Sequence, residues 1–213
     1  ALMAISEGDL IALAALPDRL GDCRILTPRA GPLGMVLDKD KTLALARSLD
    51  IATPVNFTGM PDRWPVVLKW ADPMAVQPRL EAAGLPFHKA EFAQDAQELS
   101  AALARYAPIG LQPLVQSYAA GHGVGQMFYR HKGETTLYFQ HERLHEWPPE
   151  GGVSTLCQSL PAEAHASQRA LSEKLLDAIG WEGPAMVEYR FDPATADFVL
   201  MEINGRFWGS LPL

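Results

Sequence analysis

Cysteine and long apolar runs are the scarcest features of this sequence. Its 213 residues include two cysteines, Cys23 and Cys157, whose positions match no ligand spacing of a metal site. We therefore predict two free thiols in a reducing compartment such as the cytoplasm, with a single disulfide as the alternative. No apolar run approaches the ~20 residues that span a bilayer, and Glu7 and Asp9 interrupt the apolar N-terminus. The sequence therefore predicts neither a membrane segment nor a signal peptide.

A surplus of basic residues is also missing. The chain has 18 Lys and Arg against 25 Asp and Glu, which gives a formal net charge of −7. Because binding to a phosphate backbone needs a clustered excess of Lys and Arg, we predict no nucleic-acid partner. Any phosphate group that the protein handles should be held by a few placed cations. The composition, 48% hydrophobic and 20% charged, is that of a globular protein with a substantial core in one or two domains.

Apolar periodicity predicts an α+β protein in which mostly antiparallel strands are flanked by helices. The main predicted helices cover residues 37–53, 95–110 and 166–180, and strands are predicted at 64–71, around 87–92 and over most of 111–147. Residues 131–134 have the composition of a hairpin turn. Ser6 and Asp9 form the pattern of a capping box that opens a short first helix. The stretch from Cys23 to Met35, rich in Pro and Gly, is interpreted as a connection.

The C-terminal segment from Phe198 to Gly209 reads "FVLMEINGRFWG" and has the composition of a buried strand with one polar edge. Glu202, Asn204 and Arg206 stand at alternate positions on that edge. Upstream, "PAMVEYRFD" is a second strand, joined to the first by a turn-forming segment. If the two strands pair symmetrically about Thr195, Glu188 lies directly opposite Glu202. Two carboxylates at such a position repel each other, so a compensating group is expected.

Two interpretations of this carboxylate pair remain open from spacing alone. In the first, Glu188, Glu202 and Asn204 supply an all-oxygen ligand set for Mg²⁺ or Mn²⁺, and Arg206 holds an anion delivered with the metal. In the second, Glu188 pairs with Arg190 or Arg206 on a solvated face of the strand. A register shifted by one residue would place the two glutamates on opposite faces and remove the metal site.

Arg143 is a further candidate for the site. In "YFQHERLHEW" the two-residue period places it on one face with His141 and His145. Its planar guanidinium matches the two oxygens of a substrate carboxylate. The alternative, which we favour, is a structural ion pair with Glu142, Glu146 or Glu188.

Five segments, in their order and spacing, resemble the ATP-grasp superfamily, most closely its carbamoyl-phosphate-synthase-like and carboxylate-amine ligase members. The segments are "LDKDKTLALARSLDIATP", "VVLKW", "LVQSYAAGHGVGQMF", "AMVEYRFD" and "VLMEINGRFWGS". The resemblance covers about Met35 to Leu213, and its last motif is the most specific. It implies an ATP-grasp fold in which two α+β subdomains with mostly antiparallel sheets clamp ATP.

The resemblance also implies a domain organisation and a reaction. Residues 1–35 would be the end of a preceding N-terminal domain and a linker, and 36–213 the ATP-grasp domain, with a small subdomain at about 53–113 and a large one at about 114–213. Members use ATP and Mg²⁺ to activate a carboxylate as an acyl phosphate, which an amine or thiol then attacks. The alternatives within the fold are a nucleotide-binding or regulatory module without turnover and a small-molecule kinase.

Individual site residues follow from the resemblance position by position. Glu188, Glu202 and Asn204 match the Mg²⁺ ligands, and Arg206 matches the arginine that steadies the γ-phosphate or the acyl phosphate. Lys69 matches a lysine at the α-phosphate, and either Lys39 or Lys41 matches the second ATP-contacting lysine. The adenine strand is matched by Gln116, Ser117 and Tyr118, with Gly121 at the turn that follows. For each lysine the alternative is a solvated surface cation.

Three departures weaken the resemblance. Ser117 stands where many members have a glutamate in the adenine strand, and His122 and Gly123 stand where a glutamate commonly holds the ribose. The glycine-rich loop of the small subdomain is also missing, since the segment after Lys69 contains only Gly84. A replacement could come from "PPEGGVST", in which two adjacent glycines would let backbone amides approach an anion. A plain turn is the alternative for that segment.

Overall fold

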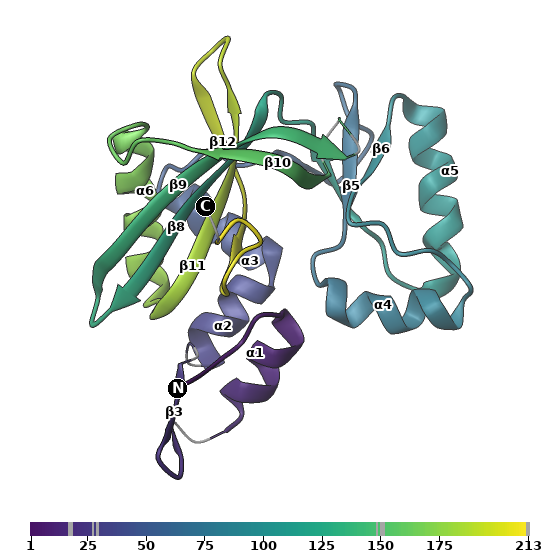
Figure 1. Cartoon of the computed structure of the whole chain (residues 1–213). Coiled ribbons are helices and arrows are strands. Elements are labelled where there is room, and N and C mark those ends of the chain that lie inside the picture. Colours follow the sequence, from purple (N-terminus) through teal and green to yellow (C-terminus); the bar gives the residue numbers. More distant parts are fainter. Residues whose placement is uncertain (17–18, 27, 29, 148, 150–151, 212–213) are drawn as a thin grey trace.

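Two antiparallel sheets with helices on their outer sides make up most of the molecule (Figure 1). The computed structural model describes residues 1–16, 19–26, 28, 30–147, 149 and 152–211. The chain therefore has the α+β architecture that apolar periodicity predicts. Among the described residues, no helix is both long and apolar enough to cross a membrane.

The larger sheet has five strands in the order β10-β9-β8-β11-β12. Its strands are β8 (His122–His131), β9 (Glu134–Trp147), β10 (Val153–Ser159), β11 (Gly183–Asp192) and β12 (Asp197–Asn204). Helix α6 (Ala166–Ile179) covers one face and buries Leu175 and Leu176 completely against the sheet. Odd-numbered residues of β11, such as Val187 and Tyr189, point into this core, so the even-numbered residues point to the opposite face.

The smaller sheet has four strands in the order β4-β7-β5-β6. Its strands are β4 (Asn56–Phe57), β5 (Val66–Lys69), β6 (Glu91–Ala93) and β7 (Leu114–Ser117). The helices α4 (Pro73–Ala82) and α5 (Ala96–Tyr106) pack on its outer side, and a 3₁₀ turn at Ala107–Ile109 follows α5. Because β7 pairs with β4 and β5, this sheet extends four residues past the subdomain edge that we predicted at residue 113.

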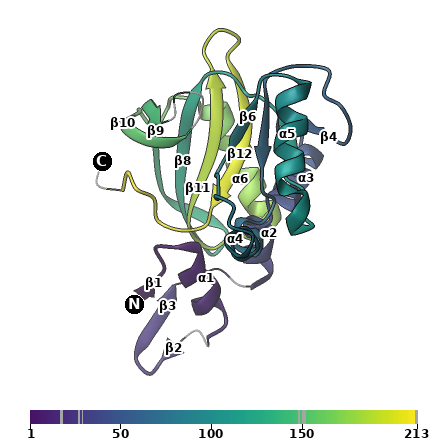
Figure 2. The ribbon, with the colours of Figure 1, turned by 90° about the vertical axis from the view of Figure 1, so that its right-hand side faces the viewer.

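The N-terminal part packs against the larger sheet. It contains a small sheet of β1 (Leu2–Met3), β2 (Arg19–Leu20) and β3 (Cys23–Leu26), and the helices α1 (Glu7–Ala14), α2 (Ala30–Leu37) and α3 (Lys39–Ser48). Leu10, Leu33 and Leu43 belong to the same apolar cluster as α6 and β11. This region and the larger sheet therefore share one core. Figure 2 shows β1, β2, β3 and α1 below the larger sheet.

Local sequence signals gave mixed results. The helix start at Ser6 is confirmed, because the Asp9 amide donates to Ser6 Oγ at 3.1 Å. The Asp9 carboxylate accepts from Ser6 Oγ at 2.7 Å, so the side-chain half of the capping box differs from the expected pattern. The hairpin turn is confirmed as well, with Lys132 and Gly133 both at positive φ. The predicted connection at 23–35 is wrong: it contains β3 and most of α2, which forms because Leu33 and Val36 are buried in the core despite Pro32. Propensity is a weak signal where burial favours another conformation.

Two strands also differ from prediction. The strand expected around 87–92 begins only at Glu91, and residues 87–90 have no regular structure. Strand β10, whose first three residues belong to the segment interpreted as an anion-binding loop or a plain turn, pairs with β9 through a register with two irregularities. Irregular pairing obscures the two-residue alternation by which a strand is recognised from sequence.

Candidate functional site

The carboxylate pair depends on a β-bulge in the β11–β12 hairpin. From Asp192–Asp197 to Tyr189–Leu200 the two strands pair residue by residue in one register. The next residue of β11, Glu188, pairs with Glu202 and not with residue 201. One extra residue, Met201, is therefore inserted in β12. The predicted juxtaposition of Glu188 and Glu202 is confirmed, although the hairpin is not symmetric about Thr195.

The bulge also decides which face Glu202 occupies. Phe198 and Leu200 pack against the core, so strict alternation would direct residue 202 into that core as well. After the bulge, Ile203 is the core residue, while Met201 and Glu202 line a cavity on the other face. The same face of β11 presents Glu188 and Arg190. The extra residue thus moves Glu202 from the core to the cavity.

Two glycines in β8 leave room for side chains that cross this strand. Strand β8 lies between β9 and β11, and Gly125 pairs with both His141 and Glu188. A Cβ at Gly123 would lie 2.5 Å from Arg143 Cδ, and one at Gly125 would lie 2.7 Å from His141 Nε2. Residues larger than glycine would displace both side chains. Space for the Arg143 side chain therefore explains why Gly123 occupies a position at which the resemblance predicts a glutamate.

Arg143 reaches across β8 into a buried network of ion pairs. Its Nη2 donates to Glu188 Oε2 at 2.6 Å, and its Nη1 donates to Glu146 Oε1 at 3.1 Å. The other oxygen of Glu146 accepts from Arg190, which also donates to the Gly121 carbonyl. The structural ion pair favoured for Arg143 is therefore present. Glu188 pairs with Arg143, and not with Arg190 or Arg206 as the second interpretation proposed.

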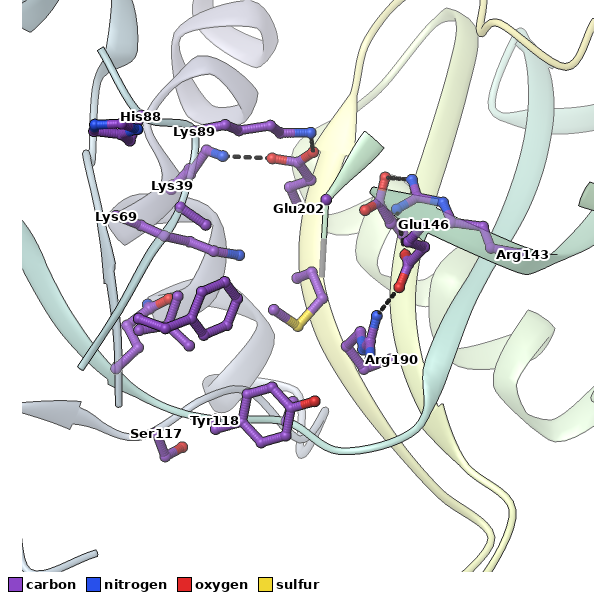
Figure 3. A pocket seen from close by; sticks show the side chains of 18 of the residues that line it. Lys39, Lys69, His88, Lys89, Ser117, Tyr118, Arg143, Glu146, Arg190 and Glu202 are labelled. Atoms are coloured by element: carbon purple, nitrogen blue, oxygen red, sulfur yellow. Dashed lines mark hydrogen bonds and ion pairs between the residues drawn. The ribbon is translucent and has the colours of Figure 1, made fainter. Parts of the chain in front are cut away.

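Three lysines converge on Glu202. Lys39, the first residue of α3, donates to Glu202 Oε2, and Lys89 lies 3.4 Å from Oε1. Lys69, the last residue of β5, is close enough to interact electrostatically with Glu202 and with both other lysines. The ammonium groups approach from the side of α3 and the smaller sheet, while Glu202 extends from β12 (Figure 3).

The pKa values reflect this crowding. Burial is the main cause that lowers the pKa of Lys69 to about 8. The charges of Lys39 and Lys89 lower this pKa further, whereas the charge of Glu202 raises it. Burial alone would raise the pKa of Glu202, but Lys39, Lys89 and Lys69 hold it well below its usual value. Burial also opposes the charge of Lys39, yet contact with Glu202 keeps the pKa of Lys39 above its usual value. Glu202 is therefore ionised at neutral pH.

These groups line one cavity of about 310 Å³ between the two sheets. One end is apolar, where Tyr118 contacts Phe92; Val67 and Met201 also belong to the cavity wall. Lys39 and Lys89 lie at the end away from Tyr118 (Figure 3). In all, the lining contains five cationic side chains, namely Lys39, Lys69, Lys89, Arg143 and Arg190, and three carboxylates, namely Glu146, Glu188 and Glu202. A protein with net charge −7 therefore holds two excess positive charges in one cleft. An anion with an apolar portion would match such a cavity.

The predicted adenine strand lies beside the apolar end, at the point where the chain passes from β7 to β8. The Ser117 amide donates to the Val55 carbonyl at 2.9 Å, and Ser117 Oγ accepts from the Val55 amide at 3.0 Å. Gln116 is buried and donates to Asn56 Oδ1 at 2.8 Å. Tyr118 makes an edge-to-face contact with Phe92. These contacts hold the strand against the cavity.

Most of the predicted site residues meet in this region. Lys39, Lys69, Gln116, Ser117, Tyr118, Arg143, Glu188 and Glu202 line the main cavity. Asn204 and Arg206 line an adjoining cavity of about 190 Å³, which shares Lys39, Lys89 and Glu202 with the first. Lys41 lines neither cavity: its side chain is 64% exposed and pairs with Asp38. Between the two lysine candidates, the geometry therefore favours Lys39.

Sequence reasoning missed several residues of the cleft. Arg190 could have been assigned from alternation, because it stands two positions after Glu188 on the same strand. Lys89 carried no such signal, since it lies in an irregular segment. In the glycine segment "PPEGGVST", Pro148, Glu150 and Gly151 lie outside the described residues, and Gly152 lines the main cavity.

Comparison with solved structures identifies the fold. A biotin carboxylase from Campylobacter jejuni in a β,γ-ATP complex superposes with a TM-score of 0.68 at 14% identity, over 96% of this chain and 47% of that chain. A D-alanine–D-alanine ligase from Bacillus anthracis complexed with ATP gives 0.58 at 16%, over 93% and 61%. The chain has the ATP-grasp fold.

A third structure with the ATP-grasp fold is an L-amino acid ligase from Bacillus licheniformis, which superposes with a TM-score of 0.62 at 15% identity, over 85% of this chain. The chain spans only 43% of that ligase and less than two thirds of the other two. No family model and no curated protein matches the sequence. The ATP-grasp fold is therefore established from structure alone.

A buried histidine beside the site should make stability depend on pH. His141 is 4% exposed, its Nδ1 lies 2.6 Å from Ser210 Oγ, and burial, with the charge of Arg143, lowers its pKa to about 4. The unfolded chain takes up this proton near the unperturbed pKa of ~6.5, so stability should rise with pH between 4 and 6.5. Because of His141, we expect the unfolding free energy to be roughly 3 kcal/mol lower at pH 4 than at pH 7.

Urea unfolding of the wild type and of His141→Gln at several pH values measures this effect. The difference in unfolding free energy between the two proteins should change by the expected amount across this range. His131→Gln, in the exposed hairpin turn, is the control for removing a histidine elsewhere in the chain. Parallel curves for the wild type and His141→Gln would show that His141 is not the source.

Proposed function

We propose that this protein is an ATP- and Mg²⁺-dependent ligase, which activates a carboxylate as an acyl phosphate for attack by an amine or thiol. The observation that carries the proposal is the cleft itself, with its apolar end, its cationic end and its excess of two positive charges between the two sheets of an ATP-grasp fold. The three structural relatives described above are named as ligases or a carboxylase, which supports the general reaction.

ATP fits the two ends of the cleft in one orientation. Its adenine would lie at the apolar end, between Phe92 on the smaller sheet and Met201 on the larger, beside Tyr118. Its phosphates would then extend toward Lys39 and Lys69, whose ammonium groups converge on the charged end. Cations held rigidly by burial stabilise phosphate charge more strongly than mobile surface lysines do.

A divalent cation also fits the charged end. Glu188 and Glu202 face each other on adjacent strands, and Asn204 follows on β12, so hard oxygen donors suited to Mg²⁺ or Mn²⁺ are close together. Among the described residues, no group of three His, Cys, Asp or Glu side chains could hold a metal alone. We therefore propose that Asn204 and phosphate oxygens complete the coordination, and that the cation neutralises the triphosphate.

The acid substrate would bind in the adjoining cavity, where Arg206 is available. Arg206 is half-buried and donates to the Phe207 carbonyl at 3.1 Å, which leaves donors of its guanidinium for a carboxylate. One oxygen of that carboxylate would attack the γ-phosphorus in line, and ADP would leave. The amine or thiol would then attack the acyl carbon and release phosphate. Free Cys23 and Cys157 accord with a cytoplasmic location, which we also propose.

Thermal unfolding tests the nucleotide and metal site. A ligand at ~100 times its dissociation constant stabilises a protein by about 2.7 kcal/mol, so saturating ATP with Mg²⁺ should raise Tm by several degrees. We expect ATP with Mg²⁺ to shift Tm more than ATP alone, and Mg²⁺ alone to have little effect. Adenosine with inorganic phosphate is the matched control. An unchanged Tm under all conditions would contradict nucleotide binding, and a shift without ADP release across a panel of acids and amines would indicate a binding module without turnover.

A further inference from the structure

We propose that Lys89 is a phosphate ligand of this cleft, and that residues 87–90 cover its phosphate end in place of a glycine-rich loop. The proposal rests on the proposed function and deepens it, because it assigns a residue that neither sequence pattern nor resemblance indicates. Residues 87–90 connect α4 to β6 and contain no glycine. Phe87, His88, Lys89 and Ala90 all line the main cavity.

The charge balance around Glu202 is the first argument. The ammonium groups of Lys39, Lys69 and Lys89 gather around Glu202. The charge of Glu188 also acts on Lys39 and Lys69, but Glu188 is paired with Arg143, so the cleft keeps two more cations than carboxylates. Like charges gathered in a partly dehydrated cleft repel one another unless anions lie between them. Two of the three ammonium charges have no counter-charge of their own, and the negative oxygens of a polyphosphate would supply it.

Exposure is the second argument, and it separates Lys89 from the other two lysines. The Lys89 side chain is 59% exposed, whereas that of Lys39 is 15% exposed. Its contact with Glu202, at 3.4 Å, is longer than a normal charge-assisted hydrogen bond. Because the Lys89 ammonium is already largely hydrated and its contact is long, it can exchange the carboxylate for a phosphate oxygen at little desolvation cost.

Position is the third argument. Lys89 belongs to the smaller-sheet side of the cleft and reaches toward β12 of the larger sheet (Figure 3). Lys89 lines both the main cavity and the adjoining cavity. A phosphate bound by Lys89 together with Lys39 and Lys69 would therefore lie between the two sheets. This position is where the proposed nucleotide site meets the proposed acid site.

Binding measurements on Lys89→Gln test the assignment. Isothermal titration calorimetry with Mg²⁺ and ATP, with adenosine, and with inorganic tripolyphosphate separates contacts to phosphate from contacts to the base. We expect the Kd for ATP to rise by about 10-fold or more, because a charge-assisted hydrogen bond is lost. Tripolyphosphate binding should weaken by a similar factor, and adenosine binding should not change. Lys89→Arg should retain most of the affinity, because it keeps the charge.

Lys132→Gln is the matched control, because this lysine is exposed in the hairpin turn and lines neither cavity. Its affinity for ATP should equal that of the wild type. An ATP affinity of Lys89→Gln within twofold of wild type, or an equal loss for ATP and adenosine, would overturn the assignment while the proposed function stands. A wild-type protein that binds neither ATP nor tripolyphosphate would overturn both.

Discussion

Glu202→Gln is expected to reduce ATP-dependent ADP formation by a factor of about 10² or more. Glu202 is the carboxylate on which Lys39, Lys69 and Lys89 converge, and it is also a proposed Mg²⁺ ligand. The amide keeps the shape of the side chain but removes the charge, so a cation loses a ligand and the lysines lose the group that orients them. A coupled assay of ADP release with a panel of acids and amines measures the effect.

The control for this variant is Glu163→Gln, which changes an exposed glutamate outside both cavities. It should leave ADP release and Tm unchanged. Both variants should have the same circular dichroism spectrum as the wild type, which shows that the fold is retained. Wild-type rates of ADP release in a folded Glu202→Gln protein would falsify the site proposed for the charged end of the cleft.

Arg143→Met is expected to destabilise the fold by about 3 to 5 kcal/mol, because it leaves buried carboxylates without their cation. Arg143 donates to both Glu188 and Glu146, and the side chains of all three residues are at most 11% exposed. Methionine retains much of the volume, so the loss is chiefly electrostatic. Urea unfolding monitored by tryptophan fluorescence measures the free energy. Arg143→Lys should recover only part of it, since one ammonium cannot match both carboxylates as the guanidinium does.

Arg63→Met provides the comparison for Arg143→Met. Arg63 also pairs with a neighbouring carboxylate, Asp62, but both side chains are exposed by more than 60%. Exposed pairs add little to stability, so this variant should unfold like the wild type. Equal unfolding curves for both arginine variants would mean that the network around Arg143 does not contribute to folding. A destabilised Arg143→Met protein that still binds ATP with wild-type affinity would assign Arg143 to structure alone.

The sequence by itself determined the elements whose signals are local. Capping at Ser6, the turn at Lys132 and Gly133, and the helix that contains Leu175 and Leu176 depend on neighbouring residues or on short periods, so they could be predicted. The motif that ends in Asn204 and Arg206 also carried the resemblance that the ATP-grasp fold confirms. Local physics therefore yielded the α+β class and the carboxylate pair, and the resemblance supplied the ATP-grasp fold, the lysines and the adenine strand.

Only the tertiary structure decided how that set is arranged. The bulge at Met201 places Glu202 on the cavity face. An inserted residue reverses which face of the strand the following side chains occupy, and no local sequence pattern predicts such an insertion. Lys89 is brought to Glu202 from 113 positions away in the sequence, through a segment without regular structure. Such contacts depend on how two separate sheets pack, and packing is a property of the whole chain. Most residues that line the cleft could be named from the sequence, but Lys89 could not, and the charge balance of the cleft arises only when the chain is folded.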